Sequence, residues 1–272
     1  MRSFHKLDMA STKWLTTHFL AKSANRIRDL ASLPIAPGSK VLDLCCGPGL
    51  FIPHLLDLVG PSGHVTGLDQ DPISLDAAHQ RLKAQPHENW DLRHVSLEEE
   101  FTGMDKYDVV LLFNSIGYFP DPFDVIRLIA KQLRSGSVII IKDFDLESFF
   151  FQPRDASMWA KLIVPAKGNN DRDNPVSFDN FLGRKIHTLH SAYQFREHTN
   201  DTWTQLMTFP FNQYEQEYLW RNVECLLNQA GRDCPSDVVE YFKRFFFPPK
   251  PEFFSYTDAM FVEVEYVTSL RL

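Results

Sequence analysis

The sequence contains few cysteines and no long apolar run. Its four cysteines among 272 residues include one adjacent pair, Cys45 and Cys46, with no C-x-x-C spacing or clustered histidines. A disulfide framework and a metal site are therefore not expected, and a reducing compartment is the simpler interpretation. No stretch reaches the roughly 18 apolar residues of a membrane span. His5, Lys6 and Asp8 also interrupt any signal-peptide core, so we expect a soluble, cytoplasmic protein.

Basic residues are also scarce relative to acidic ones. The chain has 28 Lys and Arg against 35 Asp and Glu, a formal net charge of −7. Neither half has the basic excess of a nucleic-acid binder, so no nucleic-acid partner is expected. Phenylalanine, in contrast, occurs 23 times and crowds the second half in runs such as 149–151 and 245–247. So much aromatic surface suits a cover over a substrate or a contact with a partner, for which a homodimer is one candidate.

One stretch near the N-terminus organises the chain. The apolar run from Val41 to Leu44 suits a buried parallel strand, and it ends at Gly47 and Gly49, where the backbone can turn sharply. Apolar residues at helical spacing follow. Strand, glycine turn and helix open the nucleotide-binding α/β folds, in which ligands lie beyond the carboxyl ends of the strands. Ile52 replaces the third glycine of a dinucleotide fingerprint and no P-loop lysine follows, so the loop suits a nucleoside without a phosphate chain.

The segment 43–49 reads DLCCGPG and resembles motif I of the class I S-adenosylmethionine (SAM) methyltransferases. It is most similar to the ubiquinone/menaquinone-biosynthesis branch and its small-molecule relatives. The resemblance implies SAM as the cofactor. It also implies that the cofactor is held by residues of this segment: Asp43, Cys45, Gly47 and Gly49.

A further acid stands at the spacing of a ribose-binding group. Residues 65–69 read as the second strand, and Asp69 ends it 20 residues after Gly49. An acid at this place accepts hydrogen bonds from a ribose diol. The resemblance implies the same role, with Gln70 beside it. Where the family usually has an acid that meets the adenine, this chain has Ser96 followed by Leu97, which we expect at that edge of the cofactor.

The fourth strand, predicted over 107–114, leads into the region that the resemblance places at the methyl-transfer centre. Asn114, Tyr118 and Phe119 are expected to face the cofactor and its methyl group. Many relatives have a histidine near Tyr118, and this chain has none there. A histidine base therefore cannot be assigned at this place.

Other parts of the chain supply candidates for a general base. The resemblance implies that an N-terminal helix, predicted over 10–31, lies above the cofactor and substrate, and this helix carries His18. Two acids, Asp143 and Asp145, follow the fifth strand on the ligand side of the sheet. We predict Asp145, Tyr118 and His18 as catalytic residues. The alternatives that stay open are Asp143, His187 and His190.

Strands and helices alternate through 38–146 in the order of a doubly wound parallel sheet. The resemblance implies an α/β, Rossmann-like sheet of seven mostly parallel strands with an antiparallel last strand. We expect a cap helix over 1–37, a SAM-binding core over 38–146, and a remainder over 147–272 that completes the sheet and carries a helical lid. Within this remainder the patterns predict a turn-rich mobile segment or lid over 147–176, helices over 178–192, 212–229 and 236–247, strand material over 193–199 and 203–209, and a closing strand over 260–267.

Together these features predict a SAM-dependent methyltransferase that transfers a methyl group to a small-molecule acceptor by in-line attack. Two alternatives stay open. One is a protein methyltransferase, and the other is a SAM-binding protein of the same fold that catalyses a non-methylating reaction.

Overall fold

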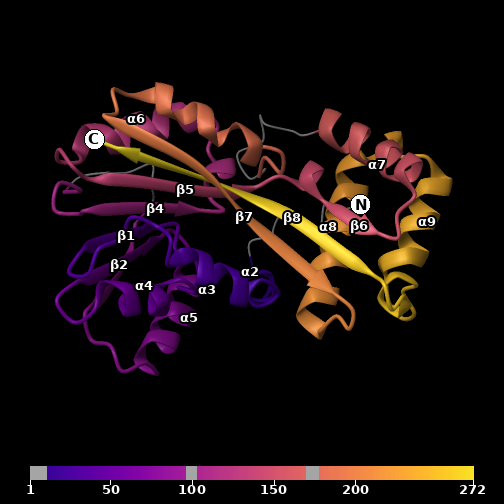
Figure 1. Cartoon of the computed structure of the whole chain (residues 1–272), viewed down its shortest axis with the longest axis horizontal. Coiled ribbons are helices and arrows are strands. Elements are labelled where there is room, and N and C mark those ends of the chain that lie inside the picture. Colours follow the sequence, from indigo (N-terminus) through magenta and orange to yellow (C-terminus); the bar gives the residue numbers. More distant parts are fainter. Residues whose placement is uncertain (1–10, 96–102, 170–177) are drawn as a thin grey trace.

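The computed structural model describes residues 11–95, 103–169 and 178–272. Five parallel strands form the first part of its sheet, in the order β3-β2-β1-β4-β5. They are β1 (Lys40–Leu44), β2 (His64–Asp69), β3 (Trp90–His94), β4 (Val109–Phe113) and β5 (Val138–Phe144). The strand order reverses between β1 and β4, and open α/β sheets bind their ligands at such a reversal. The predicted doubly wound core is therefore confirmed (Figure 1).

Antiparallel strands complete the sheet. The last strand, β8 (Met260–Arg271), pairs with β5, and β7 (Glu197–Thr208) pairs with β8 along its whole length. The antiparallel last strand is thus confirmed. The sheet has eight strands rather than seven, because β8 extends past β5 and leaves an edge that the short strand β6 (Phe150–Gln152) occupies.

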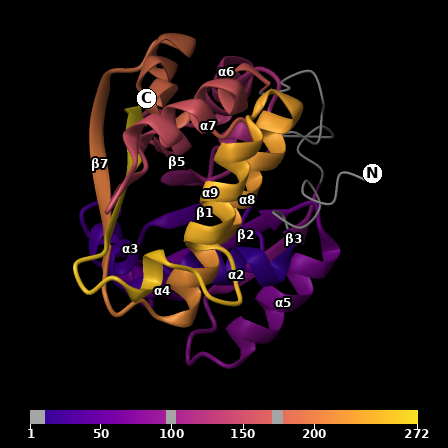
Figure 2. The same ribbon diagram turned by 90° about the vertical axis from the view of Figure 1, so that its right-hand side faces the viewer.

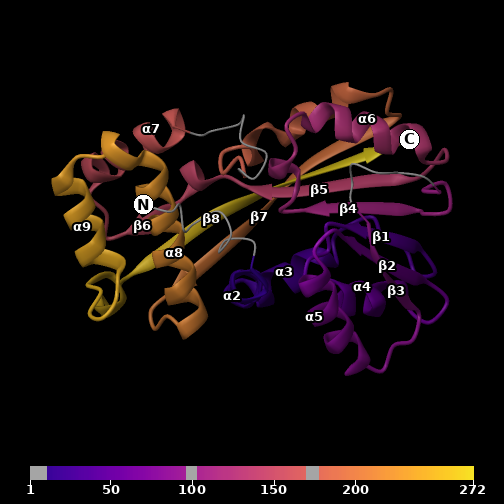
Figure 3. The ribbon, with the colours of Figure 1, turned by 180° about the vertical axis from the view of Figure 1, so that it is seen from behind.

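Helices cover both faces of the parallel strands. On one face lies α4 (Ile52–Val59), with α5 (Pro72–Lys83) beside it, and on the other lies α6 (Pro122–Gln132) (Figure 3). The 3₁₀ helix η3 (Gly183–Ala192) shares the apolar core under α6. Since every residue of β4 and β5 is buried, both faces of the central strands have to be covered by apolar side chains. Shorter 3₁₀ turns are η1 (Ile116–Tyr118), η2 (Leu146–Ser148), η4 (Gly231–Asp233) and η5 (Phe253–Ser255).

The N-terminal helix is divided in two. In place of one helix over 10–31, of which residue 10 lies outside the described part, the structure has α2 (Thr12–Leu20) and α3 (Ser23–Leu30). Lys22 lies at the break with φ −124°, outside the helical range. Its ammonium is buried against the carboxylates of Glu263 and Glu265, at 3.0 and 3.1 Å. The chain therefore leaves the helix where its lysine turns inward.

Three longer helices gather at one end of the molecule. They are α7 (Ala156–Gly168), α8 (Gln213–Ala230) and α9 (Ser236–Phe246) (Figures 1 and 2). The prediction of an irregular segment over 147–176 was wrong for α7. Its buried residues follow the 3.6-residue period, and the turn-rich sequence after 168 hid that pattern: Trp159, Leu162, Ile163 and Ala166.

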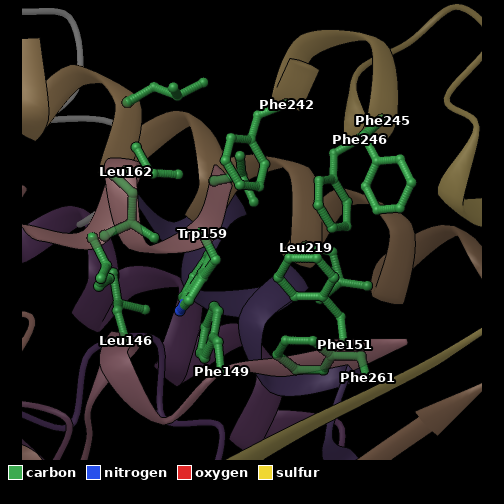
Figure 4. Close-up of a cluster of buried hydrophobic side chains, with 14 of the residues drawn as sticks. Leu146, Phe149, Phe151, Trp159, Leu162, Leu219, Phe242, Phe245, Phe246 and Phe261 are labelled. Carbon is green, nitrogen blue, oxygen red and sulfur yellow. The ribbon is translucent and has the colours of Figure 1, made fainter. Parts of the chain in front are cut away.

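Ten of the 23 phenylalanines are buried in one cluster that includes the core of this end. Phe242, Phe245 and Phe246 of α9 meet Phe151 of β6 and Trp159 of α7 in one buried cluster (Figure 4). The aromatic content of the second half therefore serves mainly to hold helices together. No described helix has the length and apolar character needed to cross a bilayer.

Candidate functional site

The backbone turns sharply after β1. Cys45, Gly47 and Gly49 have φ values of 58°, 52° and 65°, in the left-handed region. A side chain at Gly49 would place its Cβ 2.9 Å from that of Ala78, so only glycine fits there. Leu15 of α2 reaches within 3.3 Å of the position a Cβ would take on Gly47. Helix α2 thus lies over the glycine turn.

Asp69 ties the end of β2 to this turn. Its carboxylate accepts hydrogen bonds from the main-chain N–H of Gly47 at 2.7 Å and of Asp71 at 2.9 Å. Burial raises the pKa of Asp69, although these backbone donors oppose the shift. The carboxylate keeps lone pairs for a further donor such as a ribose hydroxyl. Gln70 follows on the surface, where its carbonyl contacts the His94 ring nitrogen at 3.0 Å.

Asp43 lies inside the site without a partner. It is 3% exposed near the end of β1, and no described residue donates a hydrogen bond to its carboxylate. Burial, with a smaller effect from Asp69, raises the pKa of Asp43 to about 7. Cys45 beside it stays a thiol, because burial and the two acids raise its pKa.

A third acid, Asp143, lies at the end of β5. It is fully buried; Oδ1 accepts a hydrogen bond from the N–H of Phe144 at 2.9 Å, and Oδ2 has no partner among the described residues. Burial raises the pKa of Asp143 to about 7, against the opposing charge of Lys142. Asp43, Asp69 and Asp143 are called the strand-end acids below. Three acids that form no ion pair with a described residue suit a cationic ligand.

The chain after β4 supplies the other predicted residues. Asn114 has φ 53° and is half-buried, and its side-chain Oδ1 accepts a hydrogen bond from Lys142 at 2.6 Å. The Tyr118 ring is 37% exposed and meets Phe178 edge to face, with 4.8 Å between centroids. Phe119 packs partly against the core under α6. Ser96 and Leu97, expected at the adenine, lie outside the described residues.

Two predicted catalytic residues have their reactive atoms engaged. Asp145 is fully buried and pairs with Arg184 through both carboxylate oxygens, one at 2.9 Å, while its Oδ1 also caps η2 by accepting from the N–H of Glu147. His18 is buried with Nε2 3.4 Å from the guanidinium of Arg26. Burial, Lys22 and Arg26 hold the pKa of His18 well below its usual value. We therefore infer structural roles for both residues.

The two remaining histidine alternatives lie on η3. The Nδ1 atoms of His187 and His190 each contact a main-chain carbonyl three residues earlier in the chain, at 2.8 and 2.7 Å. His190 also stacks on His198 of β7. Each ring therefore has its Nδ1 atom engaged with the main chain at the surface of η3.

A set of paired buried charges lies behind the strand ends, and the sequence analysis missed it. Lys22, Arg26, Lys142, Glu263 and Glu265 are each at most 2% exposed and are called the ion cluster below. Glu265 accepts from Lys22 at 3.1 Å, from Lys142 at 3.3 Å and from Arg26. The available signal was the presence of charges inside apolar strands, since a buried charge requires a partner.

These features fit SAM, whose sulfonium and ammonium groups are cationic and whose ribose carries a diol. The glycine turn allows close approach of a ligand to the backbone at the end of β1. Asp143 Oδ2, which has no partner among the described residues, and the buried carboxyl of Asp43 are groups that a cationic ligand would compensate.

Comparison with known proteins agrees with this geometry. The model of a methyltransferase-domain family matches residues 35–208, more than half of the chain. The demethylmenaquinone methyltransferase of Bacillus cytotoxicus is 26% identical over 150 residues, which cover 55% of this chain and 63% of that protein. The chain thus matches less than two thirds of the length of this curated relative.

Solved structures share the fold. A cyclopropane-fatty-acyl-phospholipid synthase-like protein from Lactobacillus casei superposes with a TM-score of 0.57 at 18% identity, covering 96% of this chain and 94% of that one. A phosphoethanolamine N-methyltransferase from Haemonchus contortus, solved with S-adenosylhomocysteine, gives 0.56 at 13% identity and covers 99% and 59%. The solved structures thus share the fold, and the family match shows that the chain belongs to the methyltransferase-domain family.

Proposed function

We propose that this protein is a class I SAM-dependent methyltransferase that methylates a small-molecule acceptor by in-line displacement. The observation that carries the proposal is the enclosure of the strand ends. Leu15 of α2 covers the glycine turn, and the segment 178–182 is fastened over β4 and β5. In that segment the N–H of Asp179 donates to the carbonyl of Gly117, and the carbonyl of Asn180 accepts from Leu146, both at 2.9 Å. An enclosed site favours a small acceptor over the surface of a protein.

Each residue of the site has a proposed role toward the cofactor. SAM supplies an electrophilic methyl group on its sulfonium. Asp69 binds the ribose, with Gln70 beside it. Asp43 faces the sulfonium and the charged amino-acid part, and the backbone of the glycine turn (Cys45, Gly47 and Gly49) holds the amino-acid part. Ser96 and Leu97 stay predictions for the adenine, and Phe119 for the edge of the cofactor site. The enclosure excludes water and aligns the acceptor, which is most of what in-line transfer requires.

The acceptor side is proposed to be aromatic or apolar. Tyr118 meets Phe178, and Phe178 stacks on Phe144 with 5.5 Å between centroids, so a row of rings follows β5 to the site. The two cations near these strand ends, Lys142 and Arg184, are both paired with acids. A neutral or cationic acceptor therefore suits the site better than an anionic one. The demethylmenaquinone in the name of the relative is one aromatic candidate. A cytoplasmic location and a homodimer stay predictions.

The test combines titration with an acceptor screen. Calorimetry with SAM, S-adenosylhomocysteine and NADH is expected to show binding of the first two and none of the third. Aromatic quinols, phenols and amines are then incubated with SAM, and S-adenosylhomocysteine formation is measured, with the Asp69→Ala variant as the control. Product formation with small acceptors supports the proposal. If S-adenosylhomocysteine forms only with protein acceptors, the proposed acceptor class is wrong. If SAM binds but S-adenosylhomocysteine forms with no acceptor, the result supports the non-methylating alternative.

A further inference from the structure

Asn114 has an uncommon backbone conformation, and Lys142 contacts both its backbone and its side chain. Its φ of 53° is rare for any residue with a side chain, although asparagine tolerates it better than most. Its main-chain N–H donates to the carbonyl of Lys142 at 2.8 Å, and its side-chain Oδ1 accepts from the ammonium of Lys142 at 2.6 Å. Lys142 therefore fixes both the backbone and the side chain at the end of β4.

Lys142 is itself fixed in place. Its side chain is fully buried, and its ammonium lies 3.3 Å from Glu265 and within 5.6 to 5.9 Å of the ring centroids of Phe51, Phe113 and Trp203. Glu265 is bound in turn by Lys22 and Arg26. A well-packed apolar residue often replaces a buried ionic group without loss of stability. A role for Lys142 at Asn114 explains why a charge lies inside β5.

The chemistry of the contact fixes the direction of the Asn114 amide. Burial lowers the pKa of Lys142 to about 7, and Glu265 opposes that shift. The protonated ammonium only donates, so in that form it meets Oδ1 and not the amide nitrogen. The Nδ2 hydrogens are therefore directed away from Lys142, and no described residue accepts a hydrogen bond from them. The half-buried side chain stands where β4 ends, next to the loop that carries Tyr118. The two N–H donors of the Asn114 amide are therefore available to a ligand.

We propose that Lys142 is a positioning residue that orients the Asn114 amide so that its N–H donors face the bound cofactor. The inference rests on the proposed function and on the predicted place of Asn114 in the cofactor site. Lys142 acts only through Asn114, and the ion cluster keeps it from moving.

The isosteric variant Asn114→Asp separates this role from a purely structural one. Aspartate keeps an oxygen for Lys142 and adds an ion pair, but it lacks the N–H donors. We expect its thermal midpoint to be unchanged or higher than that of the wild type. Its affinity for S-adenosylhomocysteine should fall roughly tenfold, the usual loss when one good hydrogen bond is removed. A structural role predicts unchanged affinity.

Comparison of SAM with S-adenosylhomocysteine controls for the added charge. A new carboxylate alone would favour the sulfonium of SAM over the neutral thioether, whereas loss of the donors weakens both ligands alike. Lys142→Met should also lower both affinities, because the amide is then free to rotate, and Lys142→Arg should retain most of the affinity. If Lys142→Met does not fold, Asn114→Asp and Lys142→Arg still carry the test.

Two results would overturn the inference. One is that Asn114→Asp and Lys142→Met bind both ligands within twofold of the wild type while Asp69→Ala does not. The other is that only S-adenosylhomocysteine binding weakens in Asn114→Asp. Neither result touches the choice of acceptor, which the acceptor screen tests separately.

Discussion

The molecule contains two groups of buried charges that are built in opposite ways. The ion cluster joins the break between α2 and α3, α3 itself, β5 and β8, and its cations and anions meet at hydrogen-bonding distance. The strand-end acids lie a few residues away at the carboxyl ends of β1, β2 and β5, and none of them forms an ion pair with a described residue. The charges of the ion cluster are thus paired without a ligand, whereas the strand-end acids lack an ion-pair partner among the described residues.

The pKa directions of the acids in the two groups express the same difference. Burial raises the pKa of Glu265, but Arg26, Lys142 and Lys22 outweigh it and hold that pKa well below its usual value. Burial raises the pKa of Asp43 and Asp143 to about 7, and no cation overcomes it. Charges that the protein compensates itself stabilise the fold, whereas charges that it leaves uncompensated are available to a ligand.

The largest effect is expected from breaking the ion cluster. Glu265→Gln removes the charge that three buried cations share. It should lower the free energy of unfolding by about 3–5 kcal/mol, the usual cost of leaving a buried charge without its partner. Urea unfolding followed by circular dichroism measures this change. The matched control is Glu197→Gln, whose exposed carboxylate lies 3.5 Å from Arg271 and should change stability by less than about 1 kcal/mol. Equal effects of the two variants would mean that the ion cluster contributes no more than a surface pair.

The second effect is expected among the strand-end acids. Asp69→Ala should leave the protein folded and reduce SAM affinity roughly 100-fold, because a charged acceptor of ligand hydrogen bonds is lost. Calorimetric titration gives the affinity, and thermal unfolding confirms the fold. Asp57→Ala, on an exposed acid that contacts His87 at 2.9 Å, should bind SAM as the wild type does. Unchanged affinity in a folded Asp69→Ala protein would refute the ribose assignment.

The turn that brings these acids together provides the third test. At Gly49 alanine meets both a left-handed φ of 65° and a contact of 2.9 Å with Ala78. At Gly136 alanine meets a φ of 90° but no atom within 4 Å. Both variants should be destabilised by backbone strain, and Gly49→Ala by about 1 kcal/mol more because of overpacking. The midpoints of urea unfolding measure the stability of the two variants. Equal losses of stability would show that the helix next to the turn shifts to accommodate the added methyl group.

Local patterns in the sequence were enough to predict the parallel part of the fold. The apolar run before Gly47, the glycine turn and the acid at Asp69 lie close together in the chain, and each carries its own signal. The structure places Gly47 and Asp69 in direct contact. Such features are predictable because each depends on neighbours within one β-α-β unit.

Features that depend on distant partners could not be predicted. Lys22 and Glu263 are 241 residues apart, and nothing local to either residue indicates that they meet. Asp145 had the right place at the end of a strand, but its pairing with Arg184 depends on η3, which lies 39 residues further on. In both cases the long-range contact decides whether a charged residue supports the fold or faces a ligand.

The smallest effect concerns pH and separates the two groups of charges once more. Since the pKa of Asp43 is raised to about 7, its carboxyl is mostly neutral below pH 7 and mostly ionised above it. Ionisation attracts the sulfonium of SAM but not the thioether of S-adenosylhomocysteine, so the ratio of the two affinities should rise a few-fold between about pH 6 and pH 8. Asp43→Asn should flatten most of this rise. Asp143, whose pKa is raised to the same region, and Lys142, whose pKa burial lowers to about 7, should account for the remainder. Glu265 stays ionised throughout this range, because the cations around it lower its pKa, and contributes no slope. A constant ratio across these pH values in the wild type would mean that Asp43 does not face the sulfonium.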